Sequence, residues 1–467
     1  MNNRILASLC VLCTILCAFH RASAQGPLTP PGAPAPTMLT LSQVEPRTPI
    51  TNTTAVTIST PGSYYLTANI SITNGSAITI TANQVTLDLN GFTLSSTEAS
   101  PTGTGILLAG GNVNITILNG HIKGGVTYSG GNYTGSGFAN GIYYSGFIPA
   151  NIRVSGVSVS GCLLYGIYLG TGNSTVVESC TAQTIGSYGI YANSVARSSA
   201  VQCGIVAVFA STASDCYASG TGGQVLVANI ANNCIGFCTT ASGTGMQAST
   251  ANNCFGQSSG SGPALSATTA NNCQGQNFGS GDGLDAVAAN NCQGQSAGSG
   301  TGLNASQIAT GCYGYSLNGD GLDAVTANNC QGVSTGSGIG LNASQTATGC
   351  YGTSATGPAG LSAFAANNCT GQSNGSGNGL NAIVANNCTG LTAGNGFGFG
   401  LYAQYTATSC YGICTNGGTG LQTGIAIGCY GQSSIVDGFT YNGLIAQIAN
   451  SCIATPIYSA VYKYNMP

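Results

Sequence analysis

The sequence predicts an all-β fold in which a single chain winds into a parallel β-solenoid with short coils of about 19 residues and an N-terminal cap. The stretch that starts at Gly283 is repeated almost letter for letter from Gly321. Each copy holds two half-repeats, G-[LM]-x-A followed by C-x-G-x-[ST], and such a fixed period is typical of stacked repeat units. Inside each half-repeat, small or apolar residues alternate with polar ones, which is the period of a β-strand.

Residues 1–24 have the pattern of a secretory signal peptide. Arg4 supplies the positive charge, residues 5–19 are apolar, and Ala22-Ser23-Ala24 resembles a cleavage site. The apolar run is shorter than the roughly 20 residues that a membrane-spanning helix needs, so we expect no membrane span and a secreted, periplasmic or cell-surface protein. Cleavage would leave 18 of the 21 cysteines, since Cys10, Cys13 and Cys17 lie in the signal.

Two short segments precede the solenoid. Residues 25–37 are rich in proline, which predicts an extended spacer. Residues 38–54 carry Leu39, Leu41 and Val44 at helix-like spacing before Pro46. We expect them to form the N-terminal cap, because the open end of a solenoid exposes strand edges that must be covered.

Residues 55–160 form the predicted long-coil start of the solenoid. Val85, Leu87 and Leu89 alternate with polar residues, and Asn-Gly pairs at Asn90 and Asn119 mark equivalent turns. Residues 124–148, which are rich in glycine and tyrosine, are expected to be an inserted loop.

Residues 161–455 form the predicted short-coil part with its cysteine ladder. An apolar residue, usually leucine, precedes nearly every ladder cysteine by 8 or 9 positions. The period of two predicts that Leu and Ala of L-x-A, and Cys, Gly and Ser of C-x-G-x-S, point inward into a thin tube. The ladder cysteines predicted in this way are Cys162, Cys180, Cys203, Cys216, Cys234, Cys254, Cys273, Cys292, Cys312, Cys330, Cys350, Cys369, Cys388, Cys410, Cys429 and Cys452.

An asparagine lies directly before many of these cysteines, as at Asn272, Asn291 and Asn329. Asparagine tolerates left-handed backbone angles, and its amide can stack in a hydrogen-bonded ladder, so a turn is expected there. Residues 456–467 depart from the repeat and are expected to close the C-terminal end as a cap.

The strand-Asn-Gly-strand coils, the asparagine turns and the predicted signal resemble the right-handed parallel β-helix of the pectate-lyase-like superfamily, in its uncharacterised secreted bacterial type. The resemblance covers about residues 50–455. It implies the right-handed winding, which is also the usual hand of a parallel crossover.

The same superfamily contains polysaccharide lyases and glycoside hydrolases, so an enzyme of this kind is the alternative function. The catalytic motifs of such enzymes are absent: Gly281-Asp282-Gly283 stands where the hydrolases would be expected to carry G-D-D. Asp285 and Asp323 are two coils apart, roughly 9.6 Å, and paired glycosidase carboxylates lie about 5–9.5 Å apart. We predict no catalytic residue in the short coils. An enzymatic site would instead use Asp88, His121, Lys123 and Arg153 in the long coils.

One outward column of side chains is a candidate ligand-binding face. The residue after each cysteine is often tyrosine or glutamine, and tyrosine offers an apolar ring with a polar tip to a sugar. A neighbouring outward column of aspartate and asparagine is expected beside it. The alternative is that amide and aromatic ladders simply suit a parallel stack. The candidate residues are Tyr313, Tyr351, Tyr411, Tyr430, Gln274, Gln293, Asp285 and Asp323.

The cysteines allow three interpretations. Inward cysteine packs as a small apolar residue, which favours a buried thiol ladder. The Cα atoms of cysteines on adjacent coils would also lie about 4.8 Å apart, which is within the range that a disulfide allows. Export would permit the oxidation that forms such disulfides. A metal site is not expected, because the spacing follows the coil and His121 is the only histidine after the signal.

These observations predict a secreted, non-enzymatic β-solenoid that serves as a surface or matrix component, with a polysaccharide or cell-surface glycan as its partner. No cofactor is expected. Charged residues make up 4% of the chain and the net charge is −3, so no basic surface is expected to bind nucleic acid.

Overall fold

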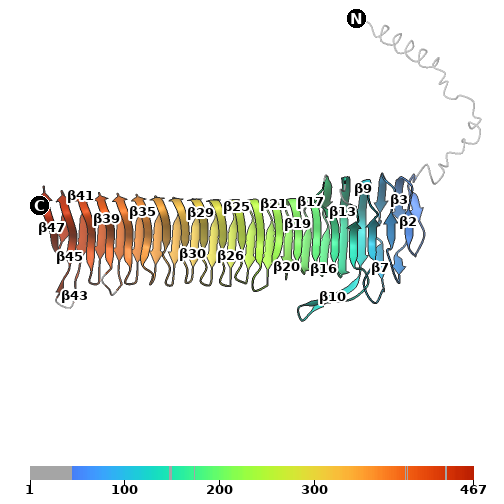
Figure 1. Cartoon of the computed structure of the whole chain (residues 1–467), viewed down its shortest axis with the longest axis horizontal. Helices are drawn as coiled ribbons and strands as arrows, with labels where there is room; N and C mark the ends of the chain where they lie inside the picture. Colours follow the sequence, from blue (N-terminus) through green and yellow to red (C-terminus); the bar gives the residue numbers. More distant parts are fainter. Residues whose placement is uncertain are drawn as a thin grey trace, which may run out of the picture. The chain divides into compact units, whose positions relative to one another are not determined.

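A computed structural model describes residues 45–146, 150–172, 174–394, 396, 398–436 and 439–466. The predicted signal peptide, the spacer and residues 38–44 of the predicted cap lie outside these residues. The unit from Thr48 to Pro467 is an all-β parallel solenoid of about 20 turns, and its described residues contain no helix. Figure 1 shows the strands of successive turns stacked side by side.

One run of strands, the Leu sheet, begins each turn and carries the inward leucines. Each of its strands pairs in parallel with the strand one turn away, so that the same position of every repeat falls in one column. Its strands are β2 (Val56–Ile58), β5 (Ile78–Ile80), β8 (Thr104–Leu108), β12 (Asn140–Tyr144), β14 (Tyr165–Gly170), β17 (Tyr188–Ala196), β19 (Val206–Ser214), β21 (Gln224–Asn232), β23 (Thr244–Asn252), β25 (Leu265–Asn271), β27 (Leu284–Asn290), β29 (Leu303–Thr310), β31 (Leu322–Asn328), β33 (Leu341–Thr348), β35 (Ala359–Asn367), β37 (Asn378–Asn386), β39 (Phe399–Thr408), β41 (Thr419–Ile427), β45 (Asn442–Asn450) and β47 (Ile457–Tyr464).

A second run, the Cys sheet, follows the asparagine turn and holds the C-x-G-x-S motifs. Its strands are β4 (Ile70–Ile72), β7 (Thr93–Ser96), the second halves of β9 (Val113–Lys123) and β13 (Ala150–Cys162), β16 (Thr181–Ile185), β18 (Ser199–Cys203), β20 (Tyr217–Gly220), β22 (Ile235–Cys238), β24 (Phe255–Ser258), β26 (Gln274–Asn277), β28 (Gln293–Ser296), β30 (Tyr313–Ser316), β32 (Gln331–Ser334), β34 (Tyr351–Ser354), β36 (Thr370–Ser373), β38 (Thr389–Thr392), β40 (Tyr411–Cys414), β42 (Tyr430–Ser433) and β46 (Ile453–Thr455).

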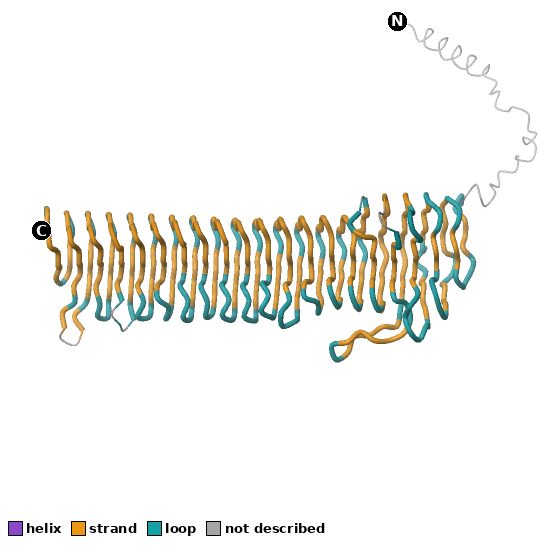
Figure 2. Tube along the Cα trace, viewed as in Figure 1, coloured by secondary structure: helices purple, strands orange, loops and turns teal. Residues whose placement is uncertain are grey.

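In the first turns a third run of strands lies between these two, and from β17 onward the ends of the long Leu-sheet strands take its place. This run consists of β1 (Thr48–Ile50), β3 (Gly62–Leu66), β6 (Val85–Asp88), the first halves of β9 and β13, and β15 (Thr175–Glu178). Figure 2 shows the loops of the short coils gathered along one edge of the stack.

Two antiparallel hairpins are inserted between strands of the stack. β10 (Gly125–Ser129) and β11 (Asn132–Ser136) form an antiparallel hairpin, and β43 (Ile435–Val436) with β44 (Phe439–Thr440) forms a second one. The expected loop at residues 124–148 is therefore only partly correct, because Asn140–Tyr144 is already the Leu-sheet strand β12.

At the two ends, strands continue the stack. β1, inside the predicted N-terminal cap, pairs in parallel with β3. β47, inside the predicted C-terminal cap, pairs in parallel with β45. Met466 packs against the end of the core, where its sulfur lies 3.3 Å from the backbone nitrogen of Cys452.

The predicted inward positions are confirmed. Leu284, Leu303 and Leu322 are fully buried, and the cysteine, glycine and serine of each C-x-G-x-S motif are buried as well. The asparagine turn is also confirmed: Asn272, Asn291 and Asn329 have φ angles of 52°, 51° and 51°. Where the repeat has Thr-Gly-Cys, Gly311 takes the same turn at φ 62°.

The bore narrows along the axis. One inward column of the Cys sheet becomes steadily smaller as the chain proceeds, and every member is buried. In order, the column is Leu94, Ile122, Val159, Ala182, Ala200, Ala218, Gly236, Gly256 and Gly275.

Where this column becomes glycine, the two sheets touch through their backbones. A Cβ atom on Gly314 would overlap the carbonyl oxygen of Gly321 across the bore, and one on Gly321 would overlap the backbone of Val333. The glycines therefore keep the sheets at a distance that permits only hydrogen atoms between them.

We expect Gly314→Ala to lower the free energy of unfolding by about 2–3 kcal/mol, because overpacking against backbone cannot be relieved by a rotamer change. Urea unfolding followed by circular dichroism measures this. Gly223→Ala is the matched control, since nothing lies within 4 Å of a Cβ there. Equal stability of the two variants would contradict the close approach of the sheets.

Candidate functional site

The outer surface of the Cys sheet carries the predicted tyrosines and glutamines in one straight column. Gln274 pairs with Gln293, and Gln293 with Tyr313. The column continues through Gln331 to Tyr351. Near its end the rings of Tyr411 and Tyr430 stack, with centroids 4.4 Å apart and planes 17° apart.

A second outward column, which the sequence reasoning missed, lies two residues further along each strand of the Cys sheet. Tyr315 and Gln372 belong to it, and the Tyr351 hydroxyl donates a 3.0 Å hydrogen bond to the Gln372 side-chain oxygen. The alternation inside C-x-G-x-S was sufficient to find it, because the residue after the glycine also points outward. Together the two columns form what we call the Tyr/Gln face.

Asp285 and Asp323 do not lie next to this face, so that expectation is wrong. Both belong to the Leu sheet, on strands β27 and β31. The Leu and Cys sheets face each other across the bore, so their outward side chains point away from each other. The predicted candidate residues are thereby divided between two surfaces.

The two aspartates form an amide ladder with asparagine. Asn304 lies between them in the column and donates a 3.1 Å hydrogen bond to Asp285, and Asn342 donates one of 3.0 Å to Asp323. Burial raises the pKa of both carboxyl groups. Each aspartate thus has a structural hydrogen-bonding role between coils.

Asp282 and Asp320 stabilise the loops between coils. Asp282 accepts a 2.7 Å hydrogen bond from the backbone of Thr301, and Asp320 accepts one of 2.8 Å from Ile339. Burial raises the pKa of both groups.

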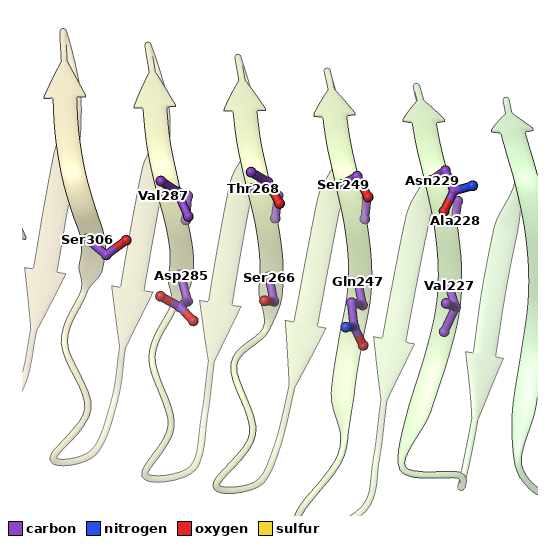
Figure 3. Close-up of a pocket in the computed structure, with 13 residues that line it drawn as sticks. Val227, Ala228, Asn229, Gln247, Ser249, Ser266, Thr268, Asp285, Val287 and Ser306 are labelled. Atoms are coloured by element: carbon purple, nitrogen blue, oxygen red, sulfur yellow. The ribbon is translucent and has the colours of Figure 1, made fainter.

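A groove lies on the Leu sheet beside Asp285 (Figure 3), with a volume of about 520 Å³. Its lining comes from strands β21 to β29 and is mostly small and polar. Gln247, Ser266 and Asp285 form one column along it, and Asn229 and Ser249 lie in the neighbouring part.

Six half-buried aromatic rings cluster on the same sheet, nearer the N-terminus, and the sequence reasoning missed them as a group. They come from β12, β14, β17 and β19. The signal was the triplet Gly-Ile-Tyr, which recurs at the start of three successive Leu-sheet strands. This aromatic cluster consists of Tyr143, Tyr165, Tyr168, Tyr188, Tyr191 and Phe209.

The residues of the enzymatic alternative are divided between two runs of strands, and none of them lines the groove beside Asp285. Asp88 accepts hydrogen bonds from the backbone of Asn90 and the side chain of Asn119. His121 lies beyond the Asn119 turn, level with Thr93 and Ser158. His121 and Lys123 thus belong to the Cys sheet.

Arg153 instead forms an ion pair with Glu178, which Arg197 also contacts at 3.1 Å. The Arg153 hydrogen bond lowers the pKa of Glu178. Both arginines are largely exposed.

The cysteine ladder differs from the prediction at two positions. Cys162 and Cys203 lie in the column of the inward serines, together with Cys238, because Cys162 is level with Ile185 and Ile185 with Cys203. Ser198 occupies the ladder position between Cys180 and Cys216, and its hydroxyl lies 3.1 Å from the Cys180 nitrogen. Cys162 is misassigned because the turn from Ser158 to Thr181 takes 23 residues, whereas the next turn takes 18. The turn that contains Cys203 has the regular length, but serine occupies the ladder position there and cysteine the serine position.

From Cys216 onward the thiols stack as predicted. The sulfur of Cys292 lies 3.4 Å from the backbone nitrogen of Cys273 and donates to the Ala270 carbonyl at 3.3 Å. All 18 cysteines of the described residues are buried and unbridged, and those residues hold no cluster of three metal-ligating side chains.

No protein-family model matches the chain. No curated protein is similar to it in sequence either. Within the described residues, no helix is long and apolar enough to cross a membrane.

The raised pKa values of Asp285 and Asp323 predict a pH-dependent stability. A carboxyl group whose pKa is higher in the folded state stabilises the fold below its ordinary value, 3.8, and this contribution is lost as the pH rises through the folded value. Asp285→Asn/Asp323→Asn should therefore flatten the decline in the free energy of unfolding above pH 3.8, measured by urea unfolding. Asn304→Asp should make it steeper, because it adds a third carboxylate between two others. Parallel curves for all three proteins would contradict this.

Because the thiols are buried, we predict that far fewer of them react in the native protein than in the denatured protein. Burial raises the pKa of Cys162 and of Cys203 to about 12, and it also excludes reagents. A chain without residues 1–24 should show almost no thiol reacting with Ellman's reagent when native, and 18 after denaturation in guanidinium. A count lower by an even number in unreduced protein would instead show disulfides between coils.

Proposed function

We propose that the protein is a secreted, non-enzymatic β-solenoid of the pectate-lyase-like type, a surface or matrix component that binds a polysaccharide or cell-surface glycan along its Tyr/Gln face. The N-terminal signal pattern supports export. The observation that carries the proposal is the regular alignment of Tyr313, Gln331 and Tyr351 on successive rungs of one flat sheet.

The chemistry of this face suits sugars. Tyr351 and Tyr411 are 36% and 43% exposed, so their rings are available at the surface while their strands stay paired. An exposed tyrosine ring can stack against the C–H face of a pyranose, and glutamine amides can hydrogen-bond sugar hydroxyls. Because tyrosine or glutamine recurs on many strands of the column, a polymer can make similar contacts many times, and weak contacts add up.

A non-enzymatic role is supported by the way the chain extends. The near-identical segments from Gly283 and Gly321 add equivalent rungs without altering the neighbouring ones. Such growth lengthens a binding surface, whereas a catalytic site needs a specific constellation.

We expect Tyr313→Ala/Tyr351→Ala to weaken glycan binding about fivefold or more, since each aromatic contact contributes about 0.5–1.5 kcal/mol. A glycan array followed by pull-down with insoluble polysaccharides measures this. Tyr405→Ala is the control, because Tyr405 is 60% exposed but lies on β39 of the Leu sheet. Unchanged binding in the double variant would remove the Tyr/Gln face from the proposal.

The same polysaccharide screen tests the enzymatic alternative. Release of reducing ends or unsaturated products, lost in His121→Ala, would contradict the non-enzymatic role.

A further inference from the structure

The aromatic cluster is one continuous arrangement of rings over four turns. Tyr143 and Tyr165 stack with centroids 5.8 Å apart and planes 6° apart. Tyr168 lies 4.7 Å from Tyr191, which in turn lies 4.8 Å from Phe209. Such offset and tilted contacts at these distances are favourable for aromatic rings.

The core does not need these rings. The inward position before four of the six rings is filled by a fully buried aliphatic residue: Ile142, Ile167, Ile190 and Val208. In later turns the same outward column carries Ser266, Asp285 and Asn304 without loss of strand pairing. The cluster is therefore a continuous aromatic patch at the surface that the packing of the core does not require, which is typical of a binding site.

The cluster and the groove belong to the same line of residues. The column that contains Tyr143, Tyr168, Tyr191 and Phe209 continues directly into Val227, and from there into the groove residues Gln247, Ser266 and Asp285. Seven steps of about 4.8 Å make this line roughly 34 Å long. Figure 3 shows the groove end, where side chains of successive strands lie side by side along the axis.

The charge of this surface restricts the ligand. Among the aromatic cluster and the residues that line the groove, Asp285 is the only charged one. Phosphate or carboxylate polymers would find no cation there, whereas a neutral sugar chain needs only ring faces, amides and hydroxyls.

We infer that the aromatic cluster and the groove together form a binding site for one neutral, linear polysaccharide that lies along the solenoid axis. The rings stack against pyranose faces at one end, and the amide and hydroxyl groups of the groove hydrogen-bond sugar hydroxyls at the other. The site shares only the class of ligand with the proposed function, because it is on the Leu sheet and uses no residue of the Tyr/Gln face.

The test compares binding of soluble mixed-linkage glucan, xyloglucan and galactomannan with binding of anionic polygalacturonate, by affinity electrophoresis. Tyr168→Ser/Tyr191→Ser should bind the preferred neutral polymer at least tenfold more weakly than the unmodified protein. Serine is chosen because the column accepts it at Ser266, and circular dichroism with a thermal melt checks folding. The chain has no tryptophan but 22 tyrosines, so a change in tyrosine fluorescence on binding is assigned to the cluster only where Tyr168→Ser/Tyr191→Ser loses it.

Two control variants make the result specific. Tyr402→Ser changes the same outward column near the other end of the Leu sheet and should leave binding unchanged. Tyr168→Phe/Tyr191→Phe keeps the rings and should retain most of the affinity.

A third variant tests whether the groove takes part. Gln247→Ala should weaken the binding of long oligosaccharides and leave the binding of short ones unaffected, because only a long chain reaches from the rings into the groove.

The outcomes separate this inference from the proposed function. Loss of binding only in Tyr168→Ser/Tyr191→Ser supports the Leu-sheet site and contradicts the Tyr/Gln face. Loss of binding only in Tyr313→Ala/Tyr351→Ala supports the Tyr/Gln face and contradicts the Leu-sheet site. Loss of binding in both double variants supports both sites. Tighter binding of polygalacturonate, or no binding of any neutral polymer by the unmodified protein, would overturn the inference.

Discussion

The backbones of the Leu and Cys sheets approach so closely that, along much of the stack, neither can carry a side chain where they meet. Glycine is required on both sides of this contact, as at Gly314 and Gly321. The remaining inward positions are then filled mostly by leucine, alanine, cysteine and serine, which suit a narrow bore. The repeat pattern of the sequence is thus a direct consequence of one backbone-to-backbone distance.

The narrow bore also decides where chemistry can occur. Its polar groups are used internally: the hydroxyl of Ser296, for example, donates to the Gly281 carbonyl at 2.9 Å, and the thiols donate to carbonyls of the preceding coil. With no room for a ligand inside, the binding that we propose has to use the outward columns. These columns repeat at the strand spacing, which suits the long polymers of that proposal.

The bore is wider in the N-terminal turns than in the later turns of the stack. The column that runs from Leu94 through Ile122 and Val159 to Gly236 shows that the bore is widest at the start of the stack. The aromatic cluster and the ion pair of Arg153 with Glu178 lie on the following turns, where this column shrinks from Val159 to Ala182, Ala200 and Ala218. These surface features thus accompany the narrowing of the bore, and the uniform short coils follow them.

The sequence by itself determined the fold class, the inward leucine and cysteine columns and the asparagine turns, because a short period repeated many times leaves little freedom in how side chains alternate. It also placed Tyr313 and Tyr351 outward in one column. Only the tertiary structure decided that Asp285 and Asp323 lie on the opposite sheet, that Cys162 and Cys203 leave the ladder, and that six rings from the early coils gather on one surface. The reason is that neighbours in a solenoid are set by backbone pairing between turns. Distance along the sequence does not tell which side of the bore a strand occupies, and where the number of residues per turn varies it does not tell which residues share a column.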